Sequence, residues 1–167
     1  VTPYTVTYDG QSHTATGTAK GIGGVALLGL DLSGTTHTNA GSTSDTWRFT
    51  DATGNYNDST GVVADLIRRA DATVTVNGYS GTYDGLAHGA TGSATGVGGV
   101  DLSAFLNLGA AFTNAPGGTA SWMFSGGTNY NDQSGTAAIT IAKADASIVV
   151  TPYTVTYDGQ SHTATGT

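Results

Sequence analysis

Apolar and polar side chains alternate at the start of the chain, on both sides of an Asp9-Gly10 pair. Every second side chain of a strand lies on the same face, so this alternation predicts two half-buried strands. An Asp-Gly pair between strands is typical of a type I′ turn, in which both central residues have positive φ. The pattern therefore predicts an antiparallel hairpin over residues 1–18. Its inward face carries Tyr4, Val6, Tyr8, His13 and Ala15, and its solvent face carries Thr5, Thr7, Thr14 and Thr16.

Further strands are indicated by two aromatic residues beyond the hairpin. Trp47 and Phe49 lie two positions apart, so they share the inward face of a strand and anchor a core. A polar turn at residues 55–58 separates that strand from an apolar strand at residues 62–67. In the apolar run at residues 25–32, Leu28, Leu30 and Leu32 alternate like a strand, whereas the later run at residues 102–106 could equally hold one helical turn. Periodicity does not decide between the two in so short a run.

The whole pattern recurs along the chain. Residues 1–18 return unchanged as residues 150–167, and a weaker copy of the hairpin lies between them. In that weaker copy, Tyr83 stands 75 positions after Tyr8. Repetition at such a period is the mark of a tandem array. We therefore predict module A (residues 1–70, with its first strand beginning at or before residue 1), module B (71–145) and the first hairpin of a further A module (146–167).

Composition supports strands and turns rather than helices. The chain has 26 glycines and 30 threonines, which favour turns and strands respectively. The fold class expected is all-β, with tandem small modules of about 75 residues and at most one short helix each. Sandwich-like and, alternatively, β-grasp-like topologies both fit. The structural core is expected to comprise Tyr8, His13, Trp47, Phe49, Tyr83, His88, Trp122 and Phe124.

Charge and cysteine content exclude several kinds of partner and chemistry. A net charge of −7 disfavours binding to nucleic acid. The absence of cysteine excludes thiol catalysis, zinc-thiolate sites and disulfides, so each small core depends on packing, neighbouring modules or ions. No run of 18 apolar residues is present, so we expect no membrane insertion by this segment.

Candidate catalytic groups are sparse. One histidine recurs in each hairpin, as His13, His88 and His162, without a second histidine to share a metal. We therefore predict a half-buried structural imidazole. The chain has no Gly-x-Ser-x-Gly motif and no glutamate to pair with an aspartate, so we predict neither enzyme activity nor a cofactor.

Calcium is the one ion for which the sequence offers candidate ligands. Asparagine and aspartate supply oxygen ligands in two loop segments, as hard cations require. The same residue types are typical of Asx turns, and no glutamate is present to bind calcium in bidentate fashion, so the plain turn is the preferred hypothesis. The calcium candidates are Asn55, Asn57, Asp58, Asn129, Asn131 and Asp132.

Five landmarks carry a family resemblance: the Tyr-Asp-Gly hairpin, the glycine-rich link at 21–24, the Thr-Asn-Ala turn at 38–40, the Asn-Tyr-Asn-Asp turn at 55–58 and the Lys-Ala-Asp-Ala joint at 143–146. Together they resemble the MBG or YDG-type tandem repeats of large bacterial secreted or cell-surface proteins. The resemblance implies an extracellular β-rich module whose arrays form stalks or fibres. It implies no catalytic residues.

We therefore expect a non-catalytic structural repeat of an extracellular stalk, fibre or filament, built by stacking of β-modules. The alternative is an adhesin or carbohydrate-binding module that uses the threonine-rich face or the end loops. The expected partners are neighbouring copies of the module, joined by covalent continuation of the chain, which we prefer, or by strand complementation from another chain. Glycans or other surface proteins are further candidates. The hairpin offered for assembly comprises Tyr153, Val155, Tyr157 and His162.

Overall fold

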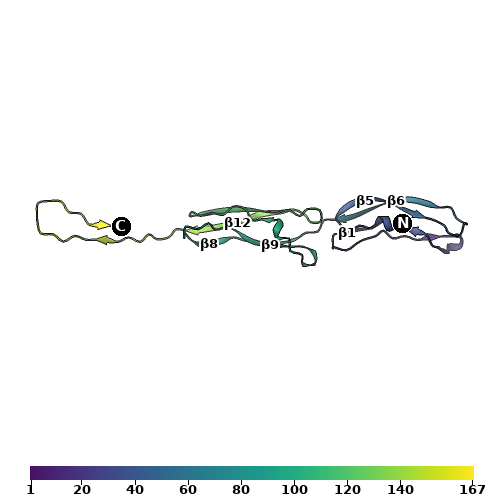
Figure 1. Cartoon of the computed structure of the whole chain (residues 1–167), viewed down its shortest axis with the longest axis horizontal. Helices are drawn as coiled ribbons and strands as arrows, with labels where there is room; N and C mark the ends of the chain where they lie inside the picture. Colours follow the sequence, from purple (N-terminus) through teal and green to yellow (C-terminus); the bar gives the residue numbers. More distant parts are fainter.

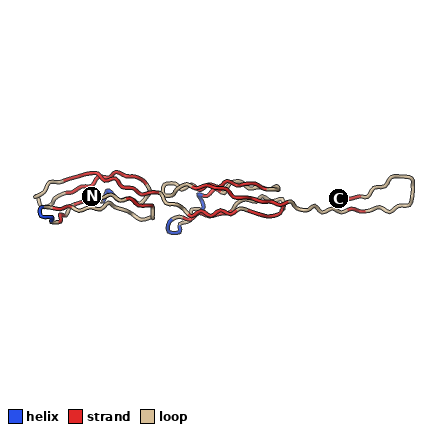
Figure 2. Tube along the Cα trace, turned by 180° about the vertical axis from the view of Figure 1, so that it is seen from behind, coloured by secondary structure: helices blue, strands red, loops and turns tan.

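In the computed structural model, which describes all 167 residues, the chain forms an elongated row of β-rich units (Figure 1). Module A lies at one end, module B lies in the middle, and residues 146–167 extend from the other end as a hairpin. Loops and short 3-10 turns join the strands (Figure 2). The predicted all-β fold is therefore confirmed.

Six strands make up module A: β1 (Thr5–Thr7), β2 (Ala19–Lys20), β3 (Ala26–Leu27), β4 (Leu30–Asp31), β5 (Gly41–Phe49) and β6 (Ser59–Arg68). The main sheet has the order β1-β6-β5-β4. The long strands β5 and β6 form its antiparallel centre, and β1 is added parallel to β6. A separate short ladder joins β2 to β3.

Six further strands make up module B: β7 (Thr73–Asn77), β8 (Tyr79–Thr82), β9 (Thr91–Thr95), β10 (Leu106–Asn107), β11 (Gly117–Phe124) and β12 (Gln133–Ala142). The main sheet, β10-β11-β12-β8, repeats that of module A, with β8 parallel to β12. β7 pairs with β9. A 3-10 turn at Ser103–Phe105 stands where one helical turn was a candidate. In the terminal hairpin, β13 (Val150–Thr151) pairs with β14 (Thr165–Gly166).

A tryptophan covers a glycine of the neighbouring strand in both modules. Trp47 stands opposite Gly61 on β5 and β6, and Trp122 stands opposite Gly135 on β11 and β12. A Cβ atom added at Gly61 would lie 2.5 Å from the Trp47 indole, and one added at Gly135 would lie 2.6 Å from Trp122. The glycines therefore leave the room in which each indole ring lies flat on its sheet.

The predicted faces of the strands agree with the structure. Phe49 and Phe124 are buried, while Trp47 and Trp122 are half-buried. In residues 1–18, Tyr4, Val6, Tyr8 and His13 are half-buried, Ala15 is buried, and the intervening threonines are exposed.

The predicted pairing within residues 1–18 is wrong. β1 pairs with residues 66–68 of β6, and His13 pairs with His37, so the two arms bind different neighbours over most of their length. They pair with each other only at their base, where Thr2 and Thr16 form an antiparallel bridge. The turn is not of type I′, because Gly10 has a φ of +79° while Asp9 keeps a negative φ. The Asp9 carboxylate accepts a hydrogen bond from the Gln11 N–H at 2.8 Å and thereby forms an Asx turn.

We predict that Gly61→Ala destabilises module A, because the new methyl group collides with the Trp47 indole. The expected loss is about 1–3 kcal/mol of unfolding free energy, measured by urea denaturation. Gly41→Ala, also in the central strand pair, is the control, since a Cβ atom there meets no atom within 4 Å. Equal stability of the two variants would contradict the role given to the tryptophan.

Candidate functional site

The joint between the modules is the most elaborate contact in the chain. The turn at residues 129–132 of module B folds back onto the link between the modules, which is the segment of residues 69–72 between β6 and β7. Ala70 donates its N–H to Asn129 O at 2.9 Å, and its carbonyl accepts the Asn131 N–H at 2.9 Å. These two bonds make a parallel bridge between Ala70 and Tyr130. Both the N–H and the carbonyl of Ala70 in the link are therefore hydrogen-bonded to this turn of module B.

Three side chains extend these contacts to both modules. Asn129 Oδ1 accepts the Ala40 N–H at 2.8 Å, and Asn129 Nδ2 donates to Asn39 Oδ1 at 3.1 Å. Asn131 Nδ2 donates to Asp71 Oδ1 at 2.7 Å. Gln133 Nε2 donates to the Ala72 carbonyl at 2.8 Å. Asn129 thus ties module B directly to the Asn-Ala turn of module A.

Tyr130 lies at the centre of the joint. Its side chain is 8% exposed and meets the Tyr8 ring of module A edge-on, with centroids 5.5 Å apart. Its hydroxyl accepts the Val97 N–H at 3.0 Å, which anchors the turn inside module B. Tyr130 belongs to the largest buried cluster, to which the link contributes Ala70 and Ala72. The other members are Ala94, Leu102 and Phe124.

The position of Tyr83 corrects a prediction. Tyr83 corresponds to Tyr8, yet it is 43% exposed and lies outside the core. Tyr8 is half-buried because it packs against Tyr130 of the following module, and Tyr83 has no following module against it. The third copy, Tyr157, is 94% exposed. This tyrosine is therefore a joint residue, which the pattern of a single module does not reveal.

Five of the six calcium candidates, all except Asn57, have side-chain hydrogen-bond partners within the protein. Asn129 and Asn131 bind the joint, as described above. Asp132 Oδ1 accepts the Gly126 N–H at 2.8 Å, and Asp58 Oδ1 accepts the Asp51 N–H at 3.0 Å. No group of three or more His, Cys, Asp or Glu side chains gathers anywhere in the chain. The geometry supports turn and docking roles for these residues.

The corresponding turn in module A is held by Asp51. Asp51 Oδ2 accepts the Tyr56 N–H at 2.9 Å and the Asn55 N–H at 2.8 Å. These hydrogen bonds, that from Tyr56 foremost, lower the pKa of Asp51. The Tyr56 hydroxyl accepts the Ile22 N–H at 3.1 Å, as Tyr130 does with Val97. The turn thus keeps its shape with no joint against it.

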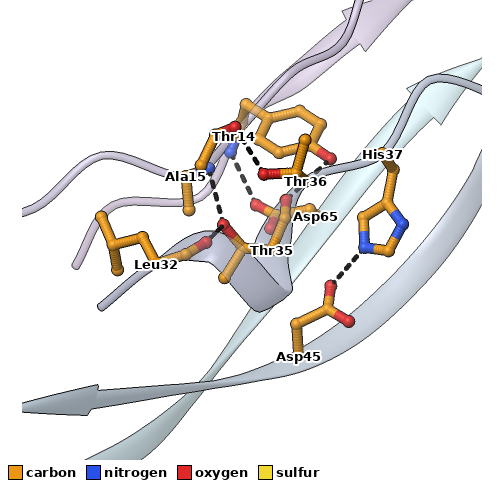
Figure 3. A network of polar contacts seen from close by, with 9 residues as sticks. Thr14, Ala15, Leu32, Thr35, Thr36, His37, Asp45 and Asp65 are labelled. Atoms are coloured by element: carbon orange, nitrogen blue, oxygen red, sulfur yellow. Dashed lines mark hydrogen bonds and ion pairs between the residues drawn. The ribbon is translucent and has the colours of Figure 1, made fainter.

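A buried polar network holds the hairpin of module A (Figure 3). Asp65, 1% exposed, accepts the Tyr4 N–H at 2.9 Å. The Thr35 hydroxyl accepts the Ala15 N–H at 3.0 Å and donates to the Leu32 carbonyl at 2.8 Å. Burial, followed by the charges of Asp65 and Asp45, raises the pKa of Tyr4. His37 Nε2 lies 2.9 Å from Asp45 Oδ2 at the edge of the network.

Module B has an apolar cluster in the place of this network. The positions of Asp45 and Asp65 are taken by Ala120 and Ile139, and that of His37 by Phe112. Inspection of the sequence missed the network. The sequence feature that could have revealed it is Asp65, a charged residue at an inward-facing position of β6 between the buried residues Val63 and Ile67.

Each hairpin repeats one histidine–aspartate pair four residues apart. The Nε2–Oδ1 distance is 3.0 Å for His13 and Asp9, 3.0 Å for His88 and Asp84, and 2.9 Å for His162 and Asp158. The backbone N–H two residues further along contributes most to lowering the pKa of each aspartate, and the histidine adds to it. His88 also stacks on Tyr79 with centroids 3.9 Å apart. These contacts fix the turn, which fits a structural imidazole.

No helix in the chain combines the length and the apolar character needed to span a membrane. Neither a comparison with models of known protein families nor a search of curated protein sequences finds a match. The joint and the repeats are therefore the features of the chain that bear on its function.

Acidification is predicted to weaken the turns. The pKa values of Asp9 and Asp84 are lower in the folded chain than in the unfolded one, so their stabilising contribution is complete above about pH 4 and is lost as the pH falls through the folded-state values. Between pH 5 and pH 2 the carboxylates of the wild type become protonated. The thermal midpoint of the Asp9→Asn, Asp84→Asn variant should therefore fall less steeply over this range than that of the wild type. Asp145→Asn, at an exposed carboxylate outside these turns, should behave like the wild type. Parallel pH profiles for all three proteins would refute the prediction.

Proposed function

We propose that the chain is a non-catalytic structural repeat of an extracellular stalk, fibre or filament. The observation that carries this proposal is the joint, in which Ala70 is hydrogen-bonded on both sides and Tyr130 packs against both modules. A joint of this kind holds two successive modules in one orientation. The resemblance to MBG or YDG-type repeats supports the same conclusion.

The two ends of a module differ, which gives the array a direction. The exit of module A offers the link, Tyr8 and the Asn39-Ala40 turn, whereas the entry of module B offers the turn at residues 129–132. Contacts between unlike surfaces repeat without closing unless the rotation between units forms a ring. The straight row in Figure 1 fits an open, linear array.

The surface chemistry is consistent with a spacer role. The net charge of −7 makes copies of the chain repel one another except where specific contacts form. Five basic residues in 167 offer little attraction for polyanions. The array would act as a mechanical spacer, and its modules would contact one another only through their ends.

The test of this function is the stiffness of the joint. Spin labels at Ser44→Cys and Ser121→Cys, exposed residues of β5 and β11, report the distance between the modules in a chain that has no other cysteine. We expect a narrow distance distribution, which broadens in the Asn129→Ala, Asn131→Ala variant because the side-chain bonds across the joint are lost.

The matched control is Asn55→Ala, Asn57→Ala, which makes the same changes in the copy of the turn that meets no module. Its distribution should equal that of the unaltered joint. A wide distribution before any change to the joint, or equal widths in all three proteins, would refute the spacer role.

A further inference from the structure

A groove crosses the joint between the two modules. Its volume is about 620 Å³, which lies within the range of about 300–1,000 Å³ that small-ligand sites occupy. Module A lines the groove with the start of β5 and the end of β6, and module B lines it with Gly127, Thr128 and Asn131. The groove is therefore formed by the meeting of two modules and belongs to neither alone.

Two adjacent arginines line this groove. Arg68 is the last residue of β6, and Arg69 is the first residue of the link. All the ion pairs in the chain join a histidine to an aspartate, so no carboxylate neutralises either guanidinium. No aspartate lines the groove, and the acid of the link, Asp71, accepts a hydrogen bond from Asn131 Nδ2 at 2.7 Å. Two of the five basic residues of an acidic chain are thus gathered at one site.

The turn of module B that lines the groove has unused hydrogen-bond donors. Gly126 donates its N–H to Asp132 Oδ1 at 2.8 Å, and Tyr130 donates its N–H to the Gly126 carbonyl at 3.1 Å. The N–H groups of Gly127 and Thr128, which lie between these bonds, donate to no acceptor in the chain. Module B therefore adds neutral donors to the positive charge that module A supplies.

The corresponding turn of module A has an acid of its own. Asp51 follows Phe49 by two positions, as Gly126 follows Phe124 in module B. The Asp51 carboxylate accepts three N–H groups of its own turn, at 2.8–3.1 Å. A glycine in place of this acid removes a negative charge from the turn at the joint. The turn of module B can therefore receive an anion from outside the chain.

The groups that line the groove match an acidic sugar. The planar guanidinium of arginine fits a carboxylate with two parallel hydrogen bonds. The hydroxyls of Ser42 and Thr128 can donate to and accept from sugar hydroxyls, and half-buried Leu66 offers apolar surface to the C–H groups of a sugar ring. The net charge of −7 repels a polymer with many negative charges, so the match is to a glycan with a single acidic unit.

We propose that this groove binds a glycan through one carboxylate-bearing sugar, such as a uronic acid residue. Arg68 and Arg69 bind the carboxylate, and the turn of module B donates its free N–H groups to the same ligand. At the end of module B the corresponding residues are Ala142 and Lys143, so the arginine pair is particular to the joint between A and B. The proposal goes beyond the spacer role, because it makes that joint an adhesive site.

Two methyl glycosides test the ligand. Methyl β-D-glucuronide carries a carboxylate where methyl β-D-glucoside carries a hydroxymethyl group. In titrations of the full chain followed by amide NMR, the glucuronide should shift the signals of Arg69, Gly127 and Thr128. The glucoside should bind about tenfold more weakly or less, because it lacks the charged acceptor. Sodium acetate, which lacks the hydroxyls, should also bind about tenfold more weakly.

Equal affinity for the glucoside would overturn the role of the carboxylate. Equal affinity for acetate would overturn the assignment to a sugar, since the groove would then bind any small carboxylate. Shifts confined to residues outside the groove would overturn the site itself.

A pair of charge-matched variants tests the arginines. Arg68→Gln, Arg69→Gln should weaken glucuronide binding about tenfold. Lys20→Gln, Arg48→Gln removes the same two charges from exposed positions of module A outside the groove, and should leave the affinity unchanged. Amide spectra of both variants that match the unaltered chain away from the substitutions would show that they fold.

Equal losses of affinity in the two variants would overturn the proposal, because the attraction would then come from the overall charge of the chain. The stiffness experiment above involves no ligand. Failure of the spacer role and failure of the glycan site are therefore separate outcomes.

Discussion

The core of module B includes residues of the link that enters it from module A. Ala70 and Ala72 lie in the same buried cluster as Phe124 and Tyr130, although they belong to the link by sequence. A module of about 75 residues buries a smaller fraction of its surface than a larger domain does, and it is marginally stable alone. Burial of the link in the core of module B, with Tyr8 of module A packed against it, offsets part of that deficit and couples the stability of each module to its neighbour, as in other repeat proteins.

Tyr130 shows how one residue serves both modules. Its hydroxyl accepts a bond from Val97 within module B, while its ring meets Tyr8 across the joint. Tyr56 makes the first of these contacts, and its half-buried side chain lines a cleft of module A. The difference between these two tyrosines lies in their surroundings, because the residues next to them are the same Asn-Tyr-Asn-Asp sequence.

Much of the fold follows from the sequence, whereas the joint does not. Alternation placed Tyr4, Val6 and Phe49 on the correct faces because side-chain direction depends only on local backbone geometry. The partner of β1 was missed because β6 lies some 60 residues away in the chain, beyond any local pattern. The role of Tyr83 was missed for a similar reason, since burial of that position depends on the next module.

The polar network of module A and the apolar cluster of module B have a consequence for folding. Neighbouring repeats with equal cores can trade strands as they emerge during synthesis, and such misassembly is a characteristic failure of multidomain proteins. Here the cores of the two adjacent modules differ, with Asp65 in one and Ile139 at the same position in the other. A hairpin of module A that entered the core of module B would lose the hydrogen bonds from Asp65 and Thr35, which disfavours an exchange of strands between neighbours.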